Sequence, residues 1–252
     1  MKVSIITVCY NSEKTIRDTI ESVLSQDYQD IEYIIIDGAS SDGTMAIVNE
    51  YRERVATIIS EPDKGIYDAM NKGVRAATGE VVGILNSDDF YESGQAVSAV
   101  ARAFHGRPAL DIVFGDVVFV HAGDLNLVRR HYGAARFKAW KLRFGWMPPH
   151  PGTFVRRALY WKTGWYRTDF KIAADYEMFV RWLLVGRASY RWIDQVLVRM
   201  RMGGVSTGGL KSSLLLNREI VRACKANHIY TNLFLVMSKL PFKLLELCRR
   251  PS

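Results

Sequence analysis

The first hundred residues alternate between two kinds of apolar pattern. Runs rich in β-branched and aliphatic residues, typical of buried strands, occupy residues 3–8, 31–37, 55–60 and 80–89. Between them, apolar residues recur every three or four positions, as Ile16, Ile20, Val23 and Leu24 do, which indicates one buried face of a helix. Strands that alternate with helices predict a mainly parallel central sheet flanked by helices, with right-handed crossovers.

After residue 110 the pattern changes. Residues 111–121 and 125–132 resemble a pair of β-strands, and residues 173–186 place apolar side chains on one helical face. A strand from residue 189 leads into a Gly/Ser loop, and helical stretches 210–228 and 231–249 follow. We therefore predict one continuous α/β domain over residues 1–205, in halves 1–105 and 106–205, and a C-terminal helical extension over 206–252.

The composition narrows the class of protein. Of 252 residues, 48% are hydrophobic, which is enough to bury a large core and argues against disorder. Three scattered cysteines with no CxxC pair exclude a disulfide framework and a cysteine-rich zinc site, and indicate a reducing compartment. The sequence shows no signal peptide and no apolar run of the roughly 20 residues that span a bilayer. We expect a cytoplasmic protein.

The net charge of +8 favours anionic partners. The basic residues concentrate in the second half of the chain, whereas the distinctive acids lie mostly in the first. A nucleic-acid-binding protein is one interpretation of this charge. We expect no nucleic-acid partner, because the basic residues follow no recognised binding module and the predicted cleft is acidic.

Acidic residues follow two of the predicted strands. Asp37 ends the second strand, and Asp88 and Asp89 end the fourth. In parallel sheets ligands bind beyond the carboxyl ends of the strands, so these acids should converge on one edge. Adjacent carboxylates repel each other, and Mg²⁺ or Mn²⁺ would compensate them. A solvated turn with a helix-capping Asp is the alternative, and the position at a strand end disfavours it.

Four blocks in order carry a family resemblance. The segments "KVSIITVCYNSEKTIRDTIESVLSQDY", "EYIIIDGASSDGT", "EPDKGIYDAMNKGVRAATGEVVGILNSDD" and "AADYEMFVRW" resemble the inverting glycosyltransferases of GT-A type, family 2, of bacterial exopolysaccharide, O-antigen and colanic acid synthesis. The resemblance spans residues 1–205. It implies a GT-A, Rossmann-like fold with a nucleotide-sugar-binding half over residues 1–105 and a smaller, β-containing acceptor half over residues 106–205.

The same resemblance implies roles for residues of the donor side. Asp89 would ligate a Mn²⁺ or Mg²⁺ ion that bridges the diphosphate, and Asp88 would lie near the ribose and this metal. Asp37 would accept a hydrogen bond from the base. The residues implied in nucleotide binding are Thr7, Val8, Tyr10, Asp37, Lys64 and Asp88.

On the acceptor side the resemblance implies that Asp175 is the general base. Many relatives have a Glu-Asp pair where this chain has Ala174-Asp175, which leaves Glu177 as a rival carboxylate. An acid at a helix N-terminus is the alternative interpretation of Asp175. His150 and Arg201 are candidates for contacts to the acceptor or the diphosphate, with a loop histidine and a surface-strand arginine as the alternatives.

These observations favour a metal-dependent transfer of a sugar from a UDP- or GDP-sugar to a hydroxyl of a lipid-linked saccharide. A sugar nucleotidyltransferase is the alternative, although "CYNSEKT" lacks the Gly-rich loop that such enzymes carry after the first strand. The apolar and basic C-terminal stretch is compatible with peripheral binding at the inner membrane, with covering the core, or with pairing to a second subunit.

Overall fold

The computed structural model describes residues 1–203 and 210–239. Strands and helices alternate through the first half: β1 (Val3–Cys9), α1 (Ile16–Leu24), β2 (Ile31–Asp37), α2 (Thr44–Glu50), β3 (Thr57–Ser60), α3 (Ile66–Ala76), β4 (Val81–Asn86), β5 (Asp89–Tyr91) and α4 (Ala96–Phe104). The strands β3, β2, β1 and β4 are neighbours in that order and all run parallel. The alternating pattern of the sequence is confirmed in this half.

The second half extends the same sheet with strands of mixed direction. Its elements are β6 (Ile112–His121), β7 (Asp124–Tyr132), a 3-10 helix (Ala139–Phe144), β8 (Thr153–Arg156), α5 (Arg157–Thr163), α6 (Ala174–Val180), a π-helical turn (Arg181–Val185) and β9 (Tyr190–Arg201). β8 runs antiparallel to both β4 and β6, whereas β9 runs parallel to β6 and antiparallel to β5. The predicted pair of strands after residue 110 is confirmed as the antiparallel pair β6 and β7.

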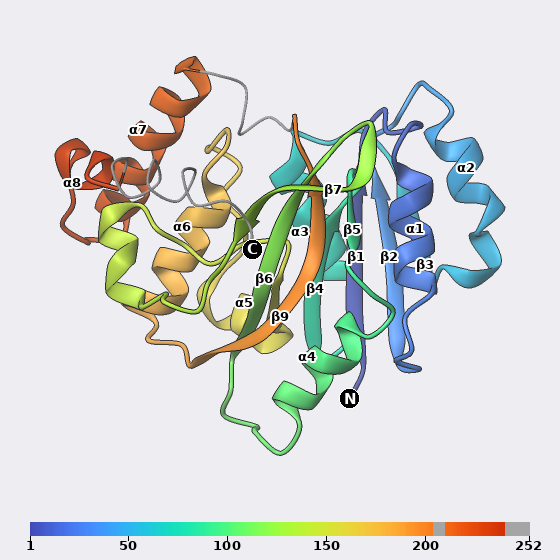
Figure 1. The fold of residues 1–252 in the computed structure, drawn as a ribbon, viewed down its shortest axis with the longest axis horizontal. Coiled ribbons are helices and arrows are strands. Elements are labelled where there is room, and N and C mark those ends of the chain that lie inside the picture. Colours follow the sequence, from blue (N-terminus) through green and yellow to red (C-terminus); the bar gives the residue numbers. More distant parts are fainter. Residues whose placement is uncertain (204–209, 240–252) are drawn as a thin grey trace.

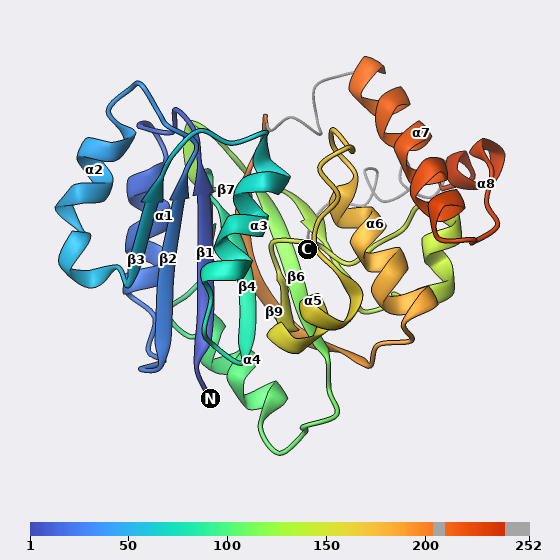
Figure 2. The same ribbon diagram turned by 180° about the vertical axis from the view of Figure 1, so that it is seen from behind.

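Two apolar layers cover the two faces of the sheet. Alternate residues of β1 point to opposite sides, so Ile6 and Val8 join the layer beneath α3, α5 and α6, while Val3 and Ile5 join the layer beneath α1, α2 and α4. Figures 1 and 2 show these two groups of helices from opposite sides. The continuous sheet between them joins the donor-side strands to the acceptor-side strands.

Helix α3 lies unusually close to the sheet. A Cβ atom added to Gly73 would come 2.3 Å from Cγ2 of Ile6 on β1, so only glycine permits this approach. The tight packing fixes the direction of α3. Its N-terminal residues, from Ile66 onward, consequently reach the edge of the sheet where β1 and β4 end.

The C-terminal part begins with α7 (Leu210–Ala226), which packs against α6, and continues with α8 (Leu233–Met237). The stretch expected to be helical over 231–249 therefore contains the short helix α8. Residues 231–232 and 238–239 are not helical, while 240–249, with Pro241, lie outside the described residues, as does the expected Gly/Ser loop at 204–209. Within residues 1–203 and 210–239, no helix combines the length and apolarity needed to cross a bilayer.

Candidate active site

A cleft of about 1090 Å³ opens beyond the carboxyl ends of β1 and β4. Its walls come from residues 8–15, Gly38, Asp42, Pro62, Asp63, residues 65–67, Ala69, Met70, residues 86–89, Phe119, His150, Pro151, Lys171, Ile172, Asp175, Met200 and Arg201. Both halves of the chain thus contribute to one hollow, which is large enough for a ligand of nucleotide-sugar size.

Asp88 and Asp89 lie in this cleft, where β4 passes into β5. The side chain of Asp89 is 1% exposed, and the backbone carbonyl of Asp89 accepts a hydrogen bond of 2.7 Å from the Thr19 hydroxyl. Burial raises the pKa of Asp88, and burial together with the Asp88 charge raises the pKa of Asp89 well above its ordinary value. For both carboxylates to be ionised together, a compensating positive charge is therefore needed.

Asn86 supplies an independent indication that the compensating charge is a cation. Its amide nitrogen donates to Asp89 at 3.4 Å, while its amide oxygen is the one buried side-chain polar atom without a partner in the described part of the chain. Carboxylate and amide oxygens are the ligands that Mg²⁺ and Mn²⁺ prefer. The set Asn86, Asp88 and Asp89 therefore fits a divalent ion.

Asn86, Asp88 and Asp89 do not supply a complete set of ligands for an ion. Among the described residues, no group of three or more His, Cys, Asp or Glu side chains comes together as a metal site. An ion held by one or two carboxylates keeps positions for water and for substrate phosphates, as Mg²⁺ commonly does. The geometry thus suits an ion shared with a phosphorylated ligand.

Asp37 and Thr7 do not line the cleft. The carboxylate of Asp37 is fully buried and accepts hydrogen bonds from the backbone N–H of Ser40 at 3.0 Å and the hydroxyl of Ser60 at 2.7 Å. Thr7 is also buried, and its hydroxyl accepts a hydrogen bond from Tyr33 on β2. Asp37 thus bonds to the loop that follows β2, and Thr7 bonds to the neighbouring strand.

Tyr10 and Asp63 form the cleft wall next to Gly38. A Cβ atom at Gly38 would lie 2.5 Å from the Asp63 carboxylate and 3.4 Å from the Tyr10 ring, so glycine lets these two side chains converge. The predicted residues Val8 and Tyr10 line the cleft, and Tyr10 is 64% exposed. Lys64 does not line it, although its neighbours Asp63 and Gly65 do.

Arg201 lies in the cleft wall with its guanidinium already bound to protein groups. It donates to the backbone carbonyl of Asp88 at 2.7 Å, forms an ion pair with Asp18, and lies over the ring of Phe90. These contacts attach the end of β9 to the segment that carries the acid pair. Arg201 therefore fixes that segment, and its predicted contact with a diphosphate would have to compete with the contact to Asp18.

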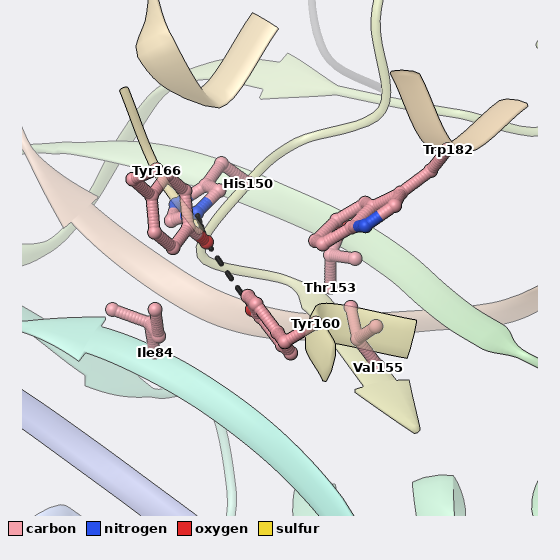
Figure 3. Close-up of a pocket in the computed structure, with 7 residues that line it drawn as sticks. All are labelled: Ile84, His150, Thr153, Val155, Tyr160, Tyr166 and Trp182. Carbon is pink, nitrogen blue, oxygen red and sulfur yellow. Dashed lines mark hydrogen bonds between the residues drawn. The ribbon is translucent and has the colours of Figure 1, made fainter. Parts of the chain in front are cut away.

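His150 lies between the cleft and a packed cluster beneath it (Figure 3). Its Nε2 atom is 2.8 Å from the hydroxyl of Tyr166, which is in turn 3.3 Å from that of Tyr160. Burial lowers the pKa of His150 to about 4, so the ring is neutral at pH 7. His150 thus offers a hydrogen bond to a ligand and no positive charge.

Asp175 lies across the cleft from the acid pair, in the first turn of α6. The backbone N–H of Tyr176 donates to its carboxylate at 2.8 Å, and Tyr67 of α3 lines the same cleft. Burial raises the pKa of Asp175 to about 6. A carboxylate that is ionised at pH 7 and has a pKa near neutrality is well suited to accept a proton.

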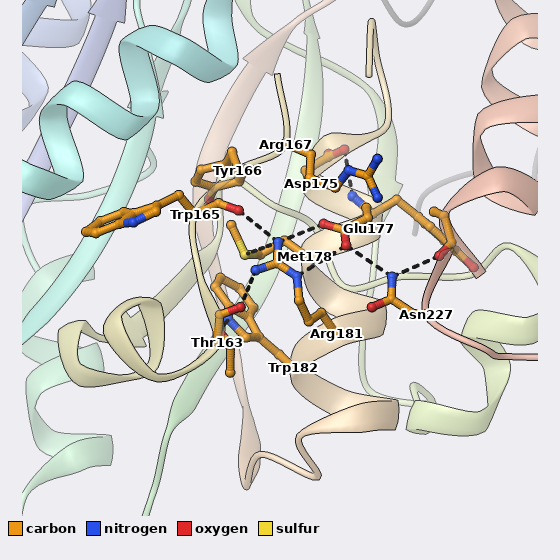
Figure 4. A network of polar contacts seen from close by, with 12 residues as sticks. Thr163, Trp165, Tyr166, Arg167, Asp175, Glu177, Met178, Arg181, Trp182 and Asn227 are labelled. Atoms are coloured by element: carbon orange, nitrogen blue, oxygen red, sulfur yellow. Dashed lines mark hydrogen bonds and ion pairs between the residues drawn. The ribbon is translucent and has the colours of Figure 1, made fainter. Parts of the chain in front are cut away.

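Glu177, the rival carboxylate, is held inside the protein (Figure 4). It is buried, pairs with Arg181 at 2.7 Å and accepts a hydrogen bond of 3.0 Å from Asn227. Arg181 also donates to the backbone carbonyls of Thr163 and Trp165. Glu177 does not line the cleft, which leaves Asp175 as the carboxylate of α6 that faces a ligand.

Comparisons with known proteins agree with this architecture. Residues 4–168 match the model of the family described as glycosyl transferase family 2. The chain is 35% identical over 185 residues to an uncharacterized glycosyltransferase of Mycobacterium tuberculosis (strain H37Rv), a match that covers 73% of this chain and 69% of the relative.

Two solved structures resemble the whole fold. S. aureus TarS 1-349 in complex with UDP-GlcNAc matches with a TM-score of 0.68 and 19% identity, over 95% of this chain and 72% of that chain. The mannosyltransferase PcManGT from Pyrobaculum calidifontis, in complex with GDP-Man and Mn²⁺, matches with a TM-score of 0.66 and 21% identity, over 98% of this chain and 73% of that chain. The predicted GT-A fold is confirmed by these likenesses.

Proposed function

This chain belongs to glycosyl transferase family 2, and on that premise we propose that it moves a sugar from a nucleotide-sugar to a hydroxyl of a saccharide acceptor, with inversion, in bacterial surface polysaccharide synthesis. One observation carries the proposal: the pair Asp88-Asp89 and the lone Asp175 line the same cleft from opposite halves of the chain. TarS with UDP-GlcNAc and PcManGT with GDP-Man support a UDP- or GDP-sugar as the donor.

The chemistry assigned to the acceptor side is a single displacement. Asp175 accepts the proton of the acceptor hydroxyl while the hydroxyl oxygen forms a bond to the anomeric carbon. The bond between that carbon and the diphosphate oxygen breaks, and the nucleoside diphosphate leaves with the electron pair. Because attack and departure occur on opposite faces, the anomeric configuration inverts and one base is sufficient.

On the donor side we assign nucleotide binding to Val8, Tyr10 and Asp88, with Asp37 bonded to the loop after β2 and Thr7 bonded to Tyr33. Asn86 and Asp89 would hold the divalent cation, with Asp88 beside it. When bound, that ion supplies positive charge to the leaving diphosphate. The exposed ring of Tyr10 offers a flat apolar face against which a base can stack.

The proposal also specifies that the saccharide acceptor is linked to a lipid. Phe234 on α8 is 82% exposed and Tyr230 is 72% exposed, and the basic residue Lys225 is exposed on the neighbouring α7. Exposed aromatic rings beside basic side chains are typical of proteins that lie on anionic bilayers. We expect the chain to sediment with anionic vesicles at low salt, and Phe234→Ser to reduce the bound fraction. Unchanged sedimentation of the variant would contradict this part.

The main proposal is tested by nucleotide binding followed by turnover. A nucleoside diphosphate with Mn²⁺ should raise the Tm of the wild type more than either component alone, because both bind the folded state. With the matching nucleotide-sugar and an acceptor, nucleoside diphosphate should be released. Release of pyrophosphate from a nucleoside triphosphate and a sugar phosphate would instead identify a nucleotidyltransferase and refute the proposal.

A further inference from the structure

The helix that carries Asp175 begins without a cap of its own. The residue before α6 is Ala173, whose side chain has no oxygen to accept hydrogen bonds from the first amide groups, although Ser, Thr, Asp or Asn usually occupies this position. In the segment that leads into α6, the backbone N–H groups of Lys171, Ile172 and Ala173 donate to one carboxylate, that of Glu219 on α7, at 2.8, 2.9 and 3.0 Å. A residue 46 positions further along the chain thus holds the segment from which the helix starts.

The environment of Glu219 shows that these bonds are its main compensation. Its side chain is only 6% exposed, and burial of an ionised carboxylate is costly unless hydrogen-bond donors surround it. Three amide groups that converge on one carboxylate form charge-assisted hydrogen bonds, which are stronger than neutral ones. Glu219 and the segment 171–173 therefore hold each other in one arrangement.

Two further side chains of the C-terminal part attach to the same region. Arg222, one turn after Glu219 on α7, donates to the backbone carbonyl of Asp169 at 3.0 Å and lies 4.5 Å from the ring centre of Phe170. Asn227, which directly follows α7, reaches Glu177 at the centre of α6 (Figure 4). Glu219 and Arg222 lie on one face of α7. Together with Asn227 they contact residues 169–177, the segment that contains Asp175.

We infer, on the basis of the function proposed above, that Glu219 is a positioning residue of the acceptor site. It fixes residues 171–173 and so the start of α6, which keeps Asp175 in place to accept the proton of the acceptor hydroxyl. Lys171 and Ile172 line the cleft beside Asp175, so the same carboxylate also shapes the wall against which the acceptor lies. Helix α7 lies beyond residues 4–168, which match the family model.

The test uses Glu219→Gln, which keeps the size of the side chain but turns one oxygen into an amide group that cannot accept hydrogen bonds. A base displaced by about 1 Å can cost about 100-fold in rate, so we expect kcat to fall about 10- to 100-fold. The KM for the nucleotide-sugar should stay within about twofold, because the donor side is untouched. Arg218→Gln, an exposed neighbour on α7, is the matched surface control and should behave as the wild type.

A second control distinguishes a displaced Asp175 from a general loss of stability as the cause of a lower kcat. Ile220→Val removes a buried methylene from the same helix and should lower the Tm while leaving kcat unchanged. The inference is overturned by Glu219→Gln with wild-type kcat. It is equally overturned if Ile220→Val loses as much kcat as Glu219→Gln at a comparable fall in Tm.

Hydrogen exchange of the wild type provides a measurement that needs neither turnover nor a folded variant. The amides of residues 171–173 should exchange slowly, as amides do when their hydrogen bonds open only with larger unfolding events. Exchange as fast as in an unstructured peptide would refute the role of Glu219. If the wild type transfers no sugar, the proposed function fails, and hydrogen exchange still decides whether Glu219 holds this segment.

Discussion

The two sides of the cleft hold their carboxylates in different ways. On the donor side, Asp88 and Asp89 follow closely on β4, and the sheet brings them to the ligand-binding edge, where Arg201 bonds to the Asp88 carbonyl. On the acceptor side, Asp175 lies on a seven-residue helix, and the segment before this helix is held by Glu219 of α7. The first carboxylates are placed mainly by a strand of the sheet, and the second is placed by side chains from distant segments.

This difference indicates which substitutions should disturb each side of the cleft. A strand in the middle of a sheet keeps its end in place through many backbone hydrogen bonds, so single substitutions at the rim change chemistry more than position. A short helix tied by a few side chains can be displaced by changes far from the cleft. The substitutions below test the comparison in order of their expected effect on turnover.

The largest effect is expected for Asp175→Asn, which removes the proposed base without changing its size. The kcat should fall about 10²- to 10⁴-fold, the usual contribution of a positioned general base. Nucleotide binding, measured by thermal shift, should remain because the donor side is intact. The control is Asp27→Asn, which changes an exposed acid that is distant from Asp175 in the sequence. Near-normal turnover by Asp175→Asn would show that another group is the base.

Asp89→Asn should have the next largest effect and should act on the other side of the cleft. Loss of charge compensation for a leaving group typically costs about 10²- to 10³-fold in kcat. Here the rise in Tm that nucleoside diphosphate produces together with Mn²⁺ should disappear as well, which Asp175→Asn does not predict. Full activity of the wild type after removal of divalent ions by a chelator would contradict the metal assignment.

The pH dependence of turnover should report Asp175. Because burial raises its pKa to about 6, the carboxylate is mostly ionised at pH 7 and becomes protonated at lower pH. The value of kcat/KM should therefore fall about tenfold for each pH unit below about 6. A profile that stays flat down to pH 4.5 would exclude a base with this pKa.

The raised pKa of Asp175 also makes the stability of the fold depend on pH, in a direction that can be stated. The folded protein binds a proton at Asp175 more tightly than the unfolded chain does, whose carboxyl has the ordinary value of 3.8. This group therefore favours folding on the acid side, and its contribution is lost as the pH rises from 3.8 through about 6. Asp175→Asn should for this reason have a higher Tm than the wild type at pH 7, and a smaller difference at pH 4.

Glu177→Gln should affect stability and leave chemistry largely intact. The variant leaves the guanidinium of Arg181 without its buried partner, and breaking such a pair costs about 3 kcal/mol. Thermal unfolding should show this loss, while turnover per folded molecule should stay close to that of the wild type. A large fall in kcat with an unchanged Tm would instead indicate that Glu177 is the base.

Lys64→Ala should have the smallest effect. The side chain is exposed and lies outside the cleft wall, and the backbone N–H of Lys64, which bonds to Asp68, is retained in the variant. We expect the affinity for nucleoside diphosphate to change by less than about twofold, as for most exposed substitutions. A larger loss, measured by titration at constant salt, would show that the lysine reaches the diphosphate after all.

The sequence predicted the donor half well because its signals are local. The β-branched runs gave the parallel strands, and the strand ends gave Asp88 and Asp89. The direction that a side chain takes at a strand end, however, is not set by local sequence patterns alone. Asp37 also ends a strand, yet its carboxylate bends back to Ser40 and Ser60, which no pattern of apolar and polar residues predicts.

The acceptor half was less predictable for the same physical reason. The motif indicated Asp175 and left Glu177 as a weaker rival, and it could not show that Glu177 pairs with Arg181 and bonds to Asn227, which follows α7. Glu219 gave no signal at all, since an acid in a helix usually faces solvent. Asn86 stands inside the quoted segment "NSDD", and its unpaired amide oxygen could have been suspected only from its place beside two acids.

The contact of Glu219 with residues 171–173 has a consequence for the order in which the protein is made. Synthesis proceeds from the N-terminus, and domains tend to fold as they emerge from the ribosome. The strand β9, whose Arg201 bonds to the segment of the acid pair, is complete at residue 201, whereas the segment before α6 lacks its anchor until residue 219 has been added. A nascent chain halted between these points would have the contacts of the acid pair next to an unfinished acceptor side.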